Sequence, residues 1–189
     1  MAIEMSTRSV ALRRSGKRQW ALKPHDLAVA LKLVVQRGTW LPYAALAKQL
    51  RLSAFEAHAA VQRLMVARLA VERDGGVHPV MAALRKFVVN GAPYCYPALR
   101  GEVTIGFPTA YAVQPLRDMV LFSEDMPPVW PHPEGPARGP TLLPLYEKLP
   151  LAARDDAAFY ELLALFDALR MGQAREREIA SRLLEERLK

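Results

Sequence analysis

The residues best suited to chemistry lie in one short stretch, residues 53–63, whose side chains could contact nucleic-acid bases. The amide of Gln62 matches the paired donor and acceptor of adenine, and the guanidinium of Arg63 matches guanine or a phosphate. Phe55 offers apolar contact to a thymine methyl group. His58 is either a further contact or an ordinary surface residue. We therefore expect modest base recognition, with affinity supplied by flanking segments.

The sequence contains no constellation typical of an enzyme. There is no phosphate-binding loop, no GxGxxG, no GxSxG and no HExxH. The histidines are scattered and do not combine with the single cysteine at the spacing of a zinc site. Cys95 has no identifiable base, so we interpret it as a buried thiol rather than a nucleophile. We expect no catalysis, no metal site and no cofactor.

Two short helices joined by a tight turn would position the candidate base contacts. Pro42 suits the first turn of a helix, where its missing N–H costs nothing. Ser53 and Glu56 have the spacing of a capping box, which predicts that a second helix begins there. Helical spacing predicts burial of Ala57, Ala60, Val61, Leu64 and Met65. We include Ser53, at the start of this helix, among the candidate DNA contacts.

A two-stranded hairpin is expected after the second helix. Residues 69–73 can form a strand, and Asp74-Gly75 is a strong hairpin signal. Arg73 flanks the tip, where a cation would meet the DNA backbone or the minor groove. Glu72 and Asp74 would repel phosphate there, so Arg73 is either a DNA contact or a solvated hairpin residue.

These helices and the hairpin carry a recognisable pattern. Its positions are Leu46-Ala47, Leu50, Leu52-Ser53, Val61, Arg63-Leu64 and Leu69 to Arg73. The pattern resembles the winged helix-turn-helix of the MarR-like bacterial transcription regulators, over about residues 24 to 80. This resemblance implies an alternative for Arg63, which would bond a phosphate or an acidic neighbour instead of a base. Arg51 stands where that family commonly has a small turn residue, and Arg68 where a glycine usually ends the recognition helix. The alternative interpretation is a plain helical hairpin followed by a turn.

Positive charge is concentrated in the first half of the chain. Residues 1–90 contain 15 Lys or Arg against 5 Asp or Glu, whereas residues 91–189 contain 11 against 14. A basic half is the electrostatic footprint of a phosphate-binding module, although a solvated basic surface would look the same.

The first 19 residues form a basic arm with weak apolar periodicity. Its candidate DNA contacts are Arg13, Arg14, Lys17 and Arg18. Such an arm can follow phosphates or enter a minor groove, and the alternative is a solubilising tail. The next stretch, Trp20 to Arg37, is apolar on most sides, which predicts a core helix or one shared with a dimer partner. Another helix is expected from Pro79 to Val89.

The character of the chain changes after residue 90. Residues 91–150 hold most of the prolines together with many aromatic residues, which predicts an extended, ordered segment wrapped over a surface. One short strand is expected around Tyr111. A helix capped by Asp155 or Asp156 should follow, interrupted at Gly172, and a last helix of mixed charge should end the chain.

The sequence thus predicts a mainly α fold: a winged helix-turn-helix with a small β-wing, then a proline-rich wrapping segment and C-terminal helices. The expected units are an arm at 1–19, the winged helix-turn-helix at 20–90, the extended segment at 91–150 and a helical region at 151–189. The expected function is a DNA-binding transcription regulator, acting as a homodimer on palindromic double-stranded DNA with recognition helices roughly 34 Å apart.

Two alternatives remain open at this point. One is a protein-binding module, or an antitoxin-like regulator, whose residues 91–189 hold a protein partner; the layout has a faint similarity to antitoxin-type winged-helix regulators. The other is an RNA-binding accessory protein with the same fold. One cysteine, no signal peptide and no long apolar run predict a cytoplasmic protein without a membrane segment.

Overall fold

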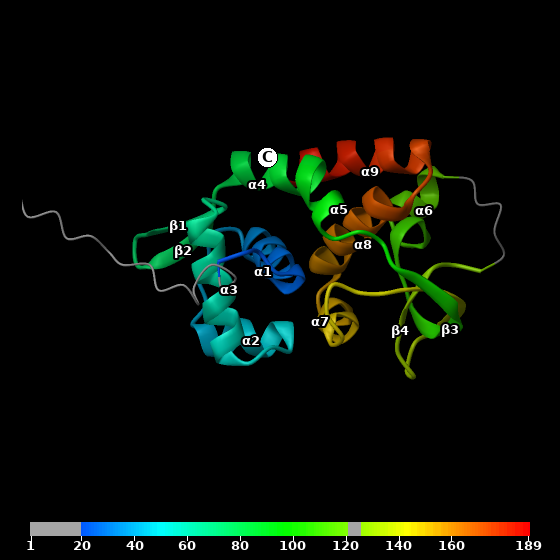
Figure 1. Cartoon of the computed structure of the whole chain (residues 1–189), viewed down its shortest axis with the longest axis horizontal. Coiled ribbons are helices and arrows are strands. Elements are labelled where there is room, and N and C mark those ends of the chain that lie inside the picture. Colours follow the sequence, from blue (N-terminus) through cyan, green and yellow to red (C-terminus); the bar gives the residue numbers. More distant parts are fainter. Residues whose placement is uncertain (1–19, 121–125) are drawn as a thin grey trace, which may run out of the picture.

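The computed structural model describes residues 20–120 and 126–189 (Figure 1). The first half contains α1 (Pro24–Val35), α2 (Tyr43–Leu50), α3 (Ala54–Val66), β1 (Ala70–Arg73), β2 (Gly76–Pro79), α4 (Met81–Lys86) and the π-helical turn η1 (Phe87–Gly91). The second half contains α5 (Ala92–Cys95), β3 (Arg100–Pro108), the 3-10 turn η2 (Ala110–Ala112), α6 (Leu116–Met119), β4 (Val129–Pro131), β5 (Ala137–Leu142), α7 (Leu149–Arg154), α8 (Ala157–Met171) and α9 (Ala174–Arg187).

The predicted helix starts agree with the structure where a side chain supplies the cap. The backbone N–H of Glu56 donates to Ser53 Oγ at 3.2 Å, and the N–H of Ser53 donates to Glu56 Oε2 at 2.8 Å, so the expected capping box begins α3. Of the two aspartates proposed for α8, Asp156 is the cap, because its Oδ1 accepts from the N–H of Phe159 at 3.1 Å. Gly172 separates α8 from α9 as predicted.

The two arginines that depart from the family pattern both end a helix in the left-handed conformation. Arg51 has φ 56° after α2, and Arg68 has φ 58° after α3. In each case the next residue closes the helix: Leu52 N–H donates to Ala47 O, and Leu69 N–H donates to Leu64 O, both at 2.9 Å. These bonds form the Schellman motif, which usually has glycine at the left-handed position. Arginine therefore carries a conformational cost at both helix ends.

The expected hairpin is present as β1 and β2. The strands pair antiparallel with Ala70 opposite Pro79 and Arg73 opposite Gly76. Asp74 and Gly75 form the turn with φ 52° and 73°, the two positive values that a tight hairpin of this hand requires.

The proline-rich part of the chain forms a second sheet that the sequence does not predict. Strand β3 pairs antiparallel with both β4 and β5, and β4 meets β5 in parallel, so the three strands close on one another. Prolines end β3 and β4, and Pro140 lies opposite Val103 beside a β-bulge, the positions where a missing N–H is tolerated. The predicted strand around Tyr111 is wrong, because Ala110 has φ 52° and turns the chain into η2.

Close backbone contact explains why this sheet contains glycines. A Cβ added to Gly106 would lie 2.0 Å from the carbonyl oxygen of Trp130, and one added to Gly135 would lie 2.1 Å from the carbonyl carbon of Gly106. These separations are far below contact distance, so only glycine fits at either position. The wrapping segment is thus ordered by tight strand packing.

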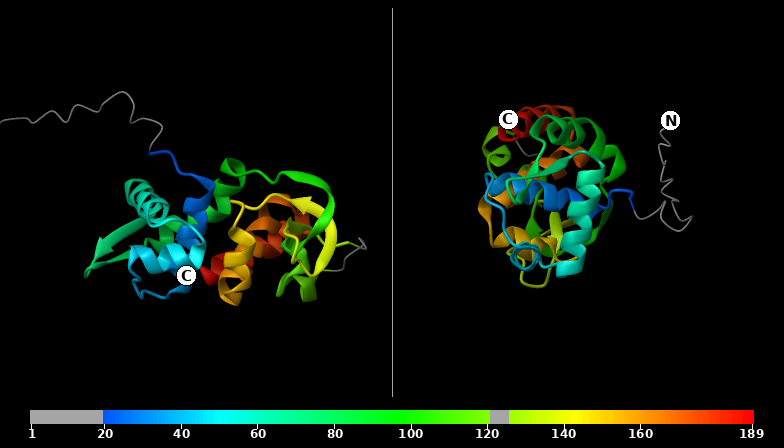
Figure 2. Two further views of the ribbon diagram at one scale, coloured as in Figure 1. Left: turned by 90° about the horizontal axis from the view of Figure 1, so that it is seen from below. Right: turned by 90° about the vertical axis from the view of Figure 1, so that its left-hand side faces the viewer.

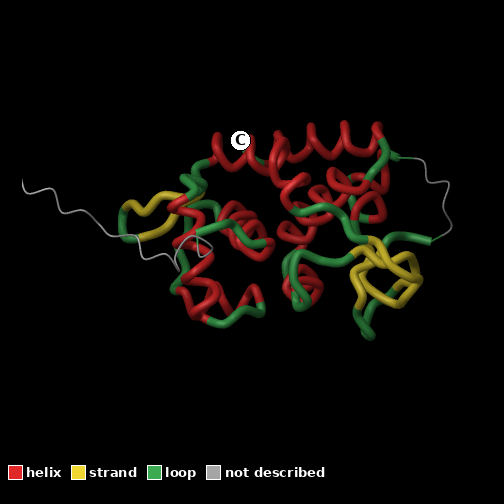
Figure 3. Tube along the Cα trace, viewed as in Figure 1, coloured by secondary structure: helices red, strands yellow, loops and turns green. Residues whose placement is uncertain are grey.

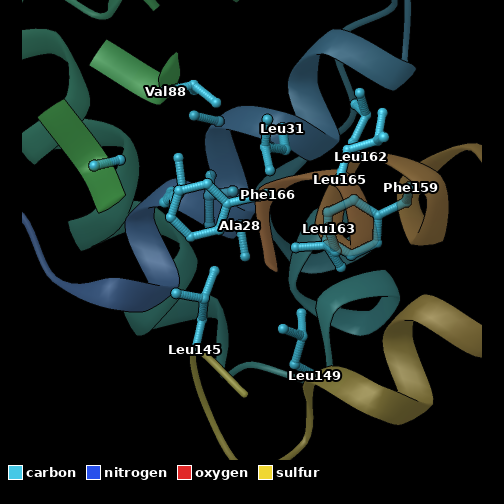
Figure 4. Packing of buried hydrophobic residues seen from close by; sticks show 14 of the residues in the cluster. Ala28, Leu31, Val88, Leu145, Leu149, Phe159, Leu162, Leu163, Leu165 and Phe166 are labelled. Carbon is cyan, nitrogen blue, oxygen red and sulfur yellow. The ribbon is translucent and has the colours of Figure 1, made fainter. Parts of the chain in front are cut away.

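The two sheets lie at opposite ends of the long axis, with helices between them (Figure 3). One hydrophobic cluster runs through the helices from both halves. Phe166 and Leu163 of α8 pack with Ala28 and Leu31 of α1, and Leu149 of α7 lies beneath them (Figure 4). Helices dominate, but the fold is mixed, with two small sheets. No helix in the described ranges combines the length and apolar character needed to cross a membrane.

Candidate nucleic-acid interface

One end of the molecule carries α2, α3 and the β1–β2 hairpin (Figure 2, right). Helix α3 packs its inner side against α1 and α2, and the fully buried residues there are Ala57, Ala60, Val61 and Leu64. All four were expected to be buried, and Met65 beside them is half-buried. The predicted helical periodicity therefore orients α3 correctly, with its opposite side facing solvent.

The exposed side of α3 is mostly apolar. Phe55 is 78% exposed and Val66 is 56% exposed. Ala59 and Gln62 lie between them at helical spacing and are half-buried. His58 is exposed one turn after Phe55. Gln62 is therefore the one long polar side chain along the centre of this face.

Arg63 does not lie on this face. Its side chain is 5% exposed, and its Nε and Nη2 atoms donate to the two carboxylate oxygens of Asp26 in α1, each at 2.6 Å. Nη2 also lies 3.1 Å from His25 Nε2, which acts as the acceptor, and burial lowers the pKa of His25. The structure thus removes Arg63 from the side chains that a base can reach. The bond to an acidic neighbour is the alternative that the sequence left open.

Asp26 is the residue that the sequence interpretation missed. Its side chain is fully buried and also accepts from the N–H of Lys23 at 2.8 Å. A signal was present, because an acidic residue near the start of an otherwise apolar helix needs a partner if it is buried. The choice of Arg63 as that partner depends on how α1 and α3 cross.

A row of rings runs from α3 towards the hairpin. The ring of His58 lies edge-on to Tyr43 at 4.9 Å between centroids, and Tyr43 lies edge-on to Trp40 at 5.2 Å. Trp40 in turn lies against Gly76 of β2. A Cβ added to Gly76 would lie 2.7 Å from the Cβ of Trp40. Burial raises the pKa of Tyr43, and the charge of Glu72 adds to this effect. We call His58, Tyr43 and Trp40 the ring row.

The hairpin presents charges of both signs. Arg73, Glu72 and Asp74 are all exposed, so the predicted local opposition between cation and acid persists in the structure. The predicted arm contacts, Arg13, Arg14, Lys17 and Arg18, lie outside the described residues. Ser53, the remaining candidate, is exposed at the start of α3 and is engaged in the capping box.

Part of the positive charge of the first half is neutralised by aspartates. Between residues 20 and 90 there are ten Lys or Arg. Three of them form ion pairs with aspartate: Lys32 with Asp156, Arg51 with Asp155, and Arg63 with Asp26. The other seven have no ion pair within the described part of the chain, and they include Lys48 of α2, Arg68 after α3 and Arg73 of the hairpin. These three exposed cations lie on or beside the elements that carry the α3 face.

Groups of metal-binding side chains and cavities are the other features that could bind a ligand. Within residues 20–120 and 126–189, no group of three or more His, Cys, Asp or Glu is placed to hold a metal ion. The expectation that Cys95 is a buried thiol is wrong, because the short helix α5 leaves Cys95 exposed together with Tyr94. A cavity of about 520 Å³ lies between α6 and α9, lined by Met119, Arg175, Glu178, Ile179 and Arg182. It lies on elements other than those that form the α3 face.

Comparison with known proteins gave no match: no protein-family model, no curated protein and no solved structure matches this chain.

Proposed function

We propose that α1, α2, α3 and the β1–β2 hairpin form a winged helix-turn-helix, and that the protein binds DNA as a transcription regulator in the cytoplasm. The observation that carries the proposal is the order of these elements in the half that holds 15 Lys or Arg against 5 Asp or Glu. A helix pair with an exposed second helix, followed by a hairpin, offers two elements to a nucleic acid, and surplus positive charge supplies the attraction to phosphate.

Phosphate contacts supply most of the affinity in this proposal. Arg63 is engaged by Asp26, so Gln62 remains the principal candidate on α3 for reading a base edge. Arg68 and Arg73 are exposed close to the hairpin, where they can approach the backbone. Binding by phosphate contacts is strongly salt-dependent and weakly sequence-dependent.

The test is a titration of labelled duplex DNA, followed by fluorescence anisotropy between about 50 and 200 mM salt. We expect binding that weakens steeply with salt. The double variant Arg68→Ala, Arg73→Ala should raise Kd at every sequence. It should also reduce the slope of log K against log salt by about two, because each arginine neutralises one phosphate.

A charge-matched control separates this site from a general effect of charge. Arg177 and Arg182 are both exposed on α9. The double variant Arg177→Ala, Arg182→Ala should leave the slope unchanged. Absence of salt-dependent binding at the lower salt concentration, or an equal weakening in both double variants, contradicts the proposal.

A homodimer on a palindromic site belongs to the same proposal. Two copies of α3 roughly 34 Å apart would enter successive major grooves. Light scattering coupled to size exclusion should give twice the chain mass of 21.1 kDa. If the protein is a monomer both alone and bound to DNA, the homodimer is contradicted, and the proposal is then limited to a protein that binds a single DNA site.

A second candidate function has one observation in its favour. Three large apolar side chains are exposed where the two halves join: Tyr94 at 85%, Leu99 at 57% and Leu143 at 47%. Leu143 N–H donates to Leu99 O at 2.9 Å, so these two lie side by side. Such residues suit a protein partner held by residues 91–189. A stoichiometric partner that co-purifies from the native host, resists nuclease and is lost with Leu99→Ser, Leu143→Ser would favour this function.

A further inference from the structure

We propose that α3 and the ring row bind unpaired bases by stacking, so that the preferred nucleic acid is single-stranded or locally melted. This inference rests on the proposed nucleic-acid binding and names the form of nucleic acid that the site takes. It adds stacking on unpaired bases to the duplex binding proposed above, in which α3 docks in a major groove but reads few base edges.

The first observation is what α3 lacks. Paired bases are read through hydrogen bonds to their edges, chiefly from Arg, Lys, Asn and Gln. Arg63 is held by Asp26 in a two-bond pair, so the half-buried Gln62 is the one long polar side chain left along the centre of the face. Few free polar groups therefore remain on α3 to recognise the edges of paired bases.

The second observation is what the same face offers instead. Phe55 is 78% exposed, far more than packing in the protein would require. His58 is exposed one helical turn away and begins the ring row, which continues through the half-buried rings of Tyr43 and Trp40 at centroid separations of 4.9 and 5.2 Å. Every base has a flat face that can stack on a ring, and such stacking contributes about 1–3 kcal/mol per base. An unpaired strand can present its bases in this way, whereas the bases of a duplex are already stacked.

The third observation is the charge around the rings. The far end of the ring row meets Gly76, which pairs with Arg73 across the hairpin. Burial raises the pKa of Tyr43 and the charge of Glu72 adds to this effect, so Glu72 is an acidic group beside the rings that would repel a phosphate there. Arg73 is the exposed cation opposite Gly76, and a strand would place its phosphates towards it. Rings beside a cation are the usual composition of a single-strand-binding surface.

The experiment compares four labelled probes of one sequence: single-stranded DNA, single-stranded RNA, the DNA duplex, and that duplex with a central bubble of about six unpaired nucleotides. Each is titrated with the full chain at low salt. We expect Phe55→Ala to weaken binding of the unpaired probes by about fivefold or more and to weaken binding of the duplex much less, because a duplex offers Phe55 only a thymine methyl group. The two single strands show whether DNA or RNA is preferred.

Two control variants make the result specific to the ring at position 55. Phe55→Trp keeps an aromatic face and should preserve binding of the unpaired probes. Tyr94→Ala removes an equally exposed ring outside α3 and should have no effect on any probe. Because Phe55 is exposed, all variants should keep the parent circular-dichroism spectrum, and the comparison is made only between folded proteins.

The outcomes separate this inference from the proposed function. If Phe55→Ala changes all four probes equally, or none of them, the stacking inference is overturned while salt-dependent duplex binding still supports the DNA-binding function. If no probe binds even at low salt, the DNA-binding function fails and the inference fails with it. Selective weakening of the unpaired probes, restored by Phe55→Trp, supports both.

Discussion

Each half of the protein buries an Arg–Asp pair, but the two pairs join different parts of the structure. In the first half, Arg63 of α3 bonds Asp26 of α1, so one side chain links two helices. In the second half, Asp167 and Arg170 are three residues apart on α8, with 2.8 Å between Arg170 Nε and Asp167 Oδ1. Both members of this second pair belong to one helix, and their remaining hydrogen bonds go to segments outside that helix.

The partners of the second pair explain what it does. Asp167 Oδ2 accepts from Thr109 Oγ1 and from Trp130 Nε1, each at 2.7 Å, which ties β4 and the turn after β3 to α8. Arg170 donates to the carbonyls of Tyr96, Pro97 and Leu143. These hydrogen bonds hold the irregular backbone at residues 96–97 and 143 against the end of α8.

The two halves are held in order by different kinds of contact. The first half is organised by regular helices and a hairpin, and its buried pair adds a link between elements that already exist. The proline-rich half has short strands and irregular connections, so one helix supplies the hydrogen bonds that its backbone does not make internally. We therefore expect the second pair to matter more for stability than the first.

The largest effect is expected for Asp167→Ala. The change leaves the donors of Thr109, Trp130 and Arg170 without their acceptor, and Arg170 becomes an uncompensated charge with a side chain 4% exposed. We expect the free energy of unfolding to fall by about 4 kcal/mol, within the range for breaking a buried pair. Urea denaturation followed by circular dichroism measures the change.

The variant Asp167→Asn is the control for this position. Asparagine keeps one carbonyl acceptor but removes the charge, so its stability should lie between those of the parent and Asp167→Ala. Equal stability of Asp167→Ala and the parent would show that α8 does not hold the sheet through this carboxylate.

A smaller fall in the free energy of unfolding, about 3 kcal/mol, is expected for Arg63→Met. The fully buried carboxylate of Asp26 then lacks two hydrogen bonds but keeps the N–H of Lys23 at 2.8 Å, so fewer groups are left unsatisfied than at Asp167. Nucleic-acid binding by the folded variant should equal that of the parent, because Arg63 does not reach the surface.

Arg51→Met provides the matched surface control for Arg63→Met. Arg51 pairs with Asp155, and the two side chains are 42% and 44% exposed. An exposed pair of this kind contributes little to stability, because solvent screens the two charges. If Arg51→Met destabilised the protein as much as Arg63→Met, burial would not be the reason for the importance of the Arg63 pair.

The smallest effect has the opposite sign. Arg68 has φ 58° and is exposed, and the left-handed conformation costs a non-glycine residue about 1 kcal/mol. Arg68→Gly removes that cost but adds freedom to the unfolded chain, so we expect a net gain of about 0.5 kcal/mol. Thermal denaturation should show a higher midpoint, and a lower midpoint would mean that the arginine makes a stabilising contact.

The sequence predicts the helix and the hairpin of the candidate site, but it does not predict which side chains are exposed there. The capping box of Ser53 and Glu56 and the Asp74-Gly75 turn are local signals, so α3 and the hairpin could be located from their residue types alone. The same signals do not reveal that Arg63 is taken up by Asp26, 37 positions earlier in the chain. They also do not place Trp40 and Tyr43 beside His58, because those contacts depend on how α2, α3 and the hairpin pack.

The sequence alone determines the features that depend on neighbouring residues. These are the helix caps, the hairpin turn, the apolar periodicity and the basic character of the first half. Tertiary structure decided the second sheet, because residues such as Gly106 and Trp130 approach each other across more than twenty positions and their compatibility shows only when the backbones meet. It also decided which arginine is buried. Local patterns specify conformation, whereas long-range contacts determine which polar groups are shielded from water.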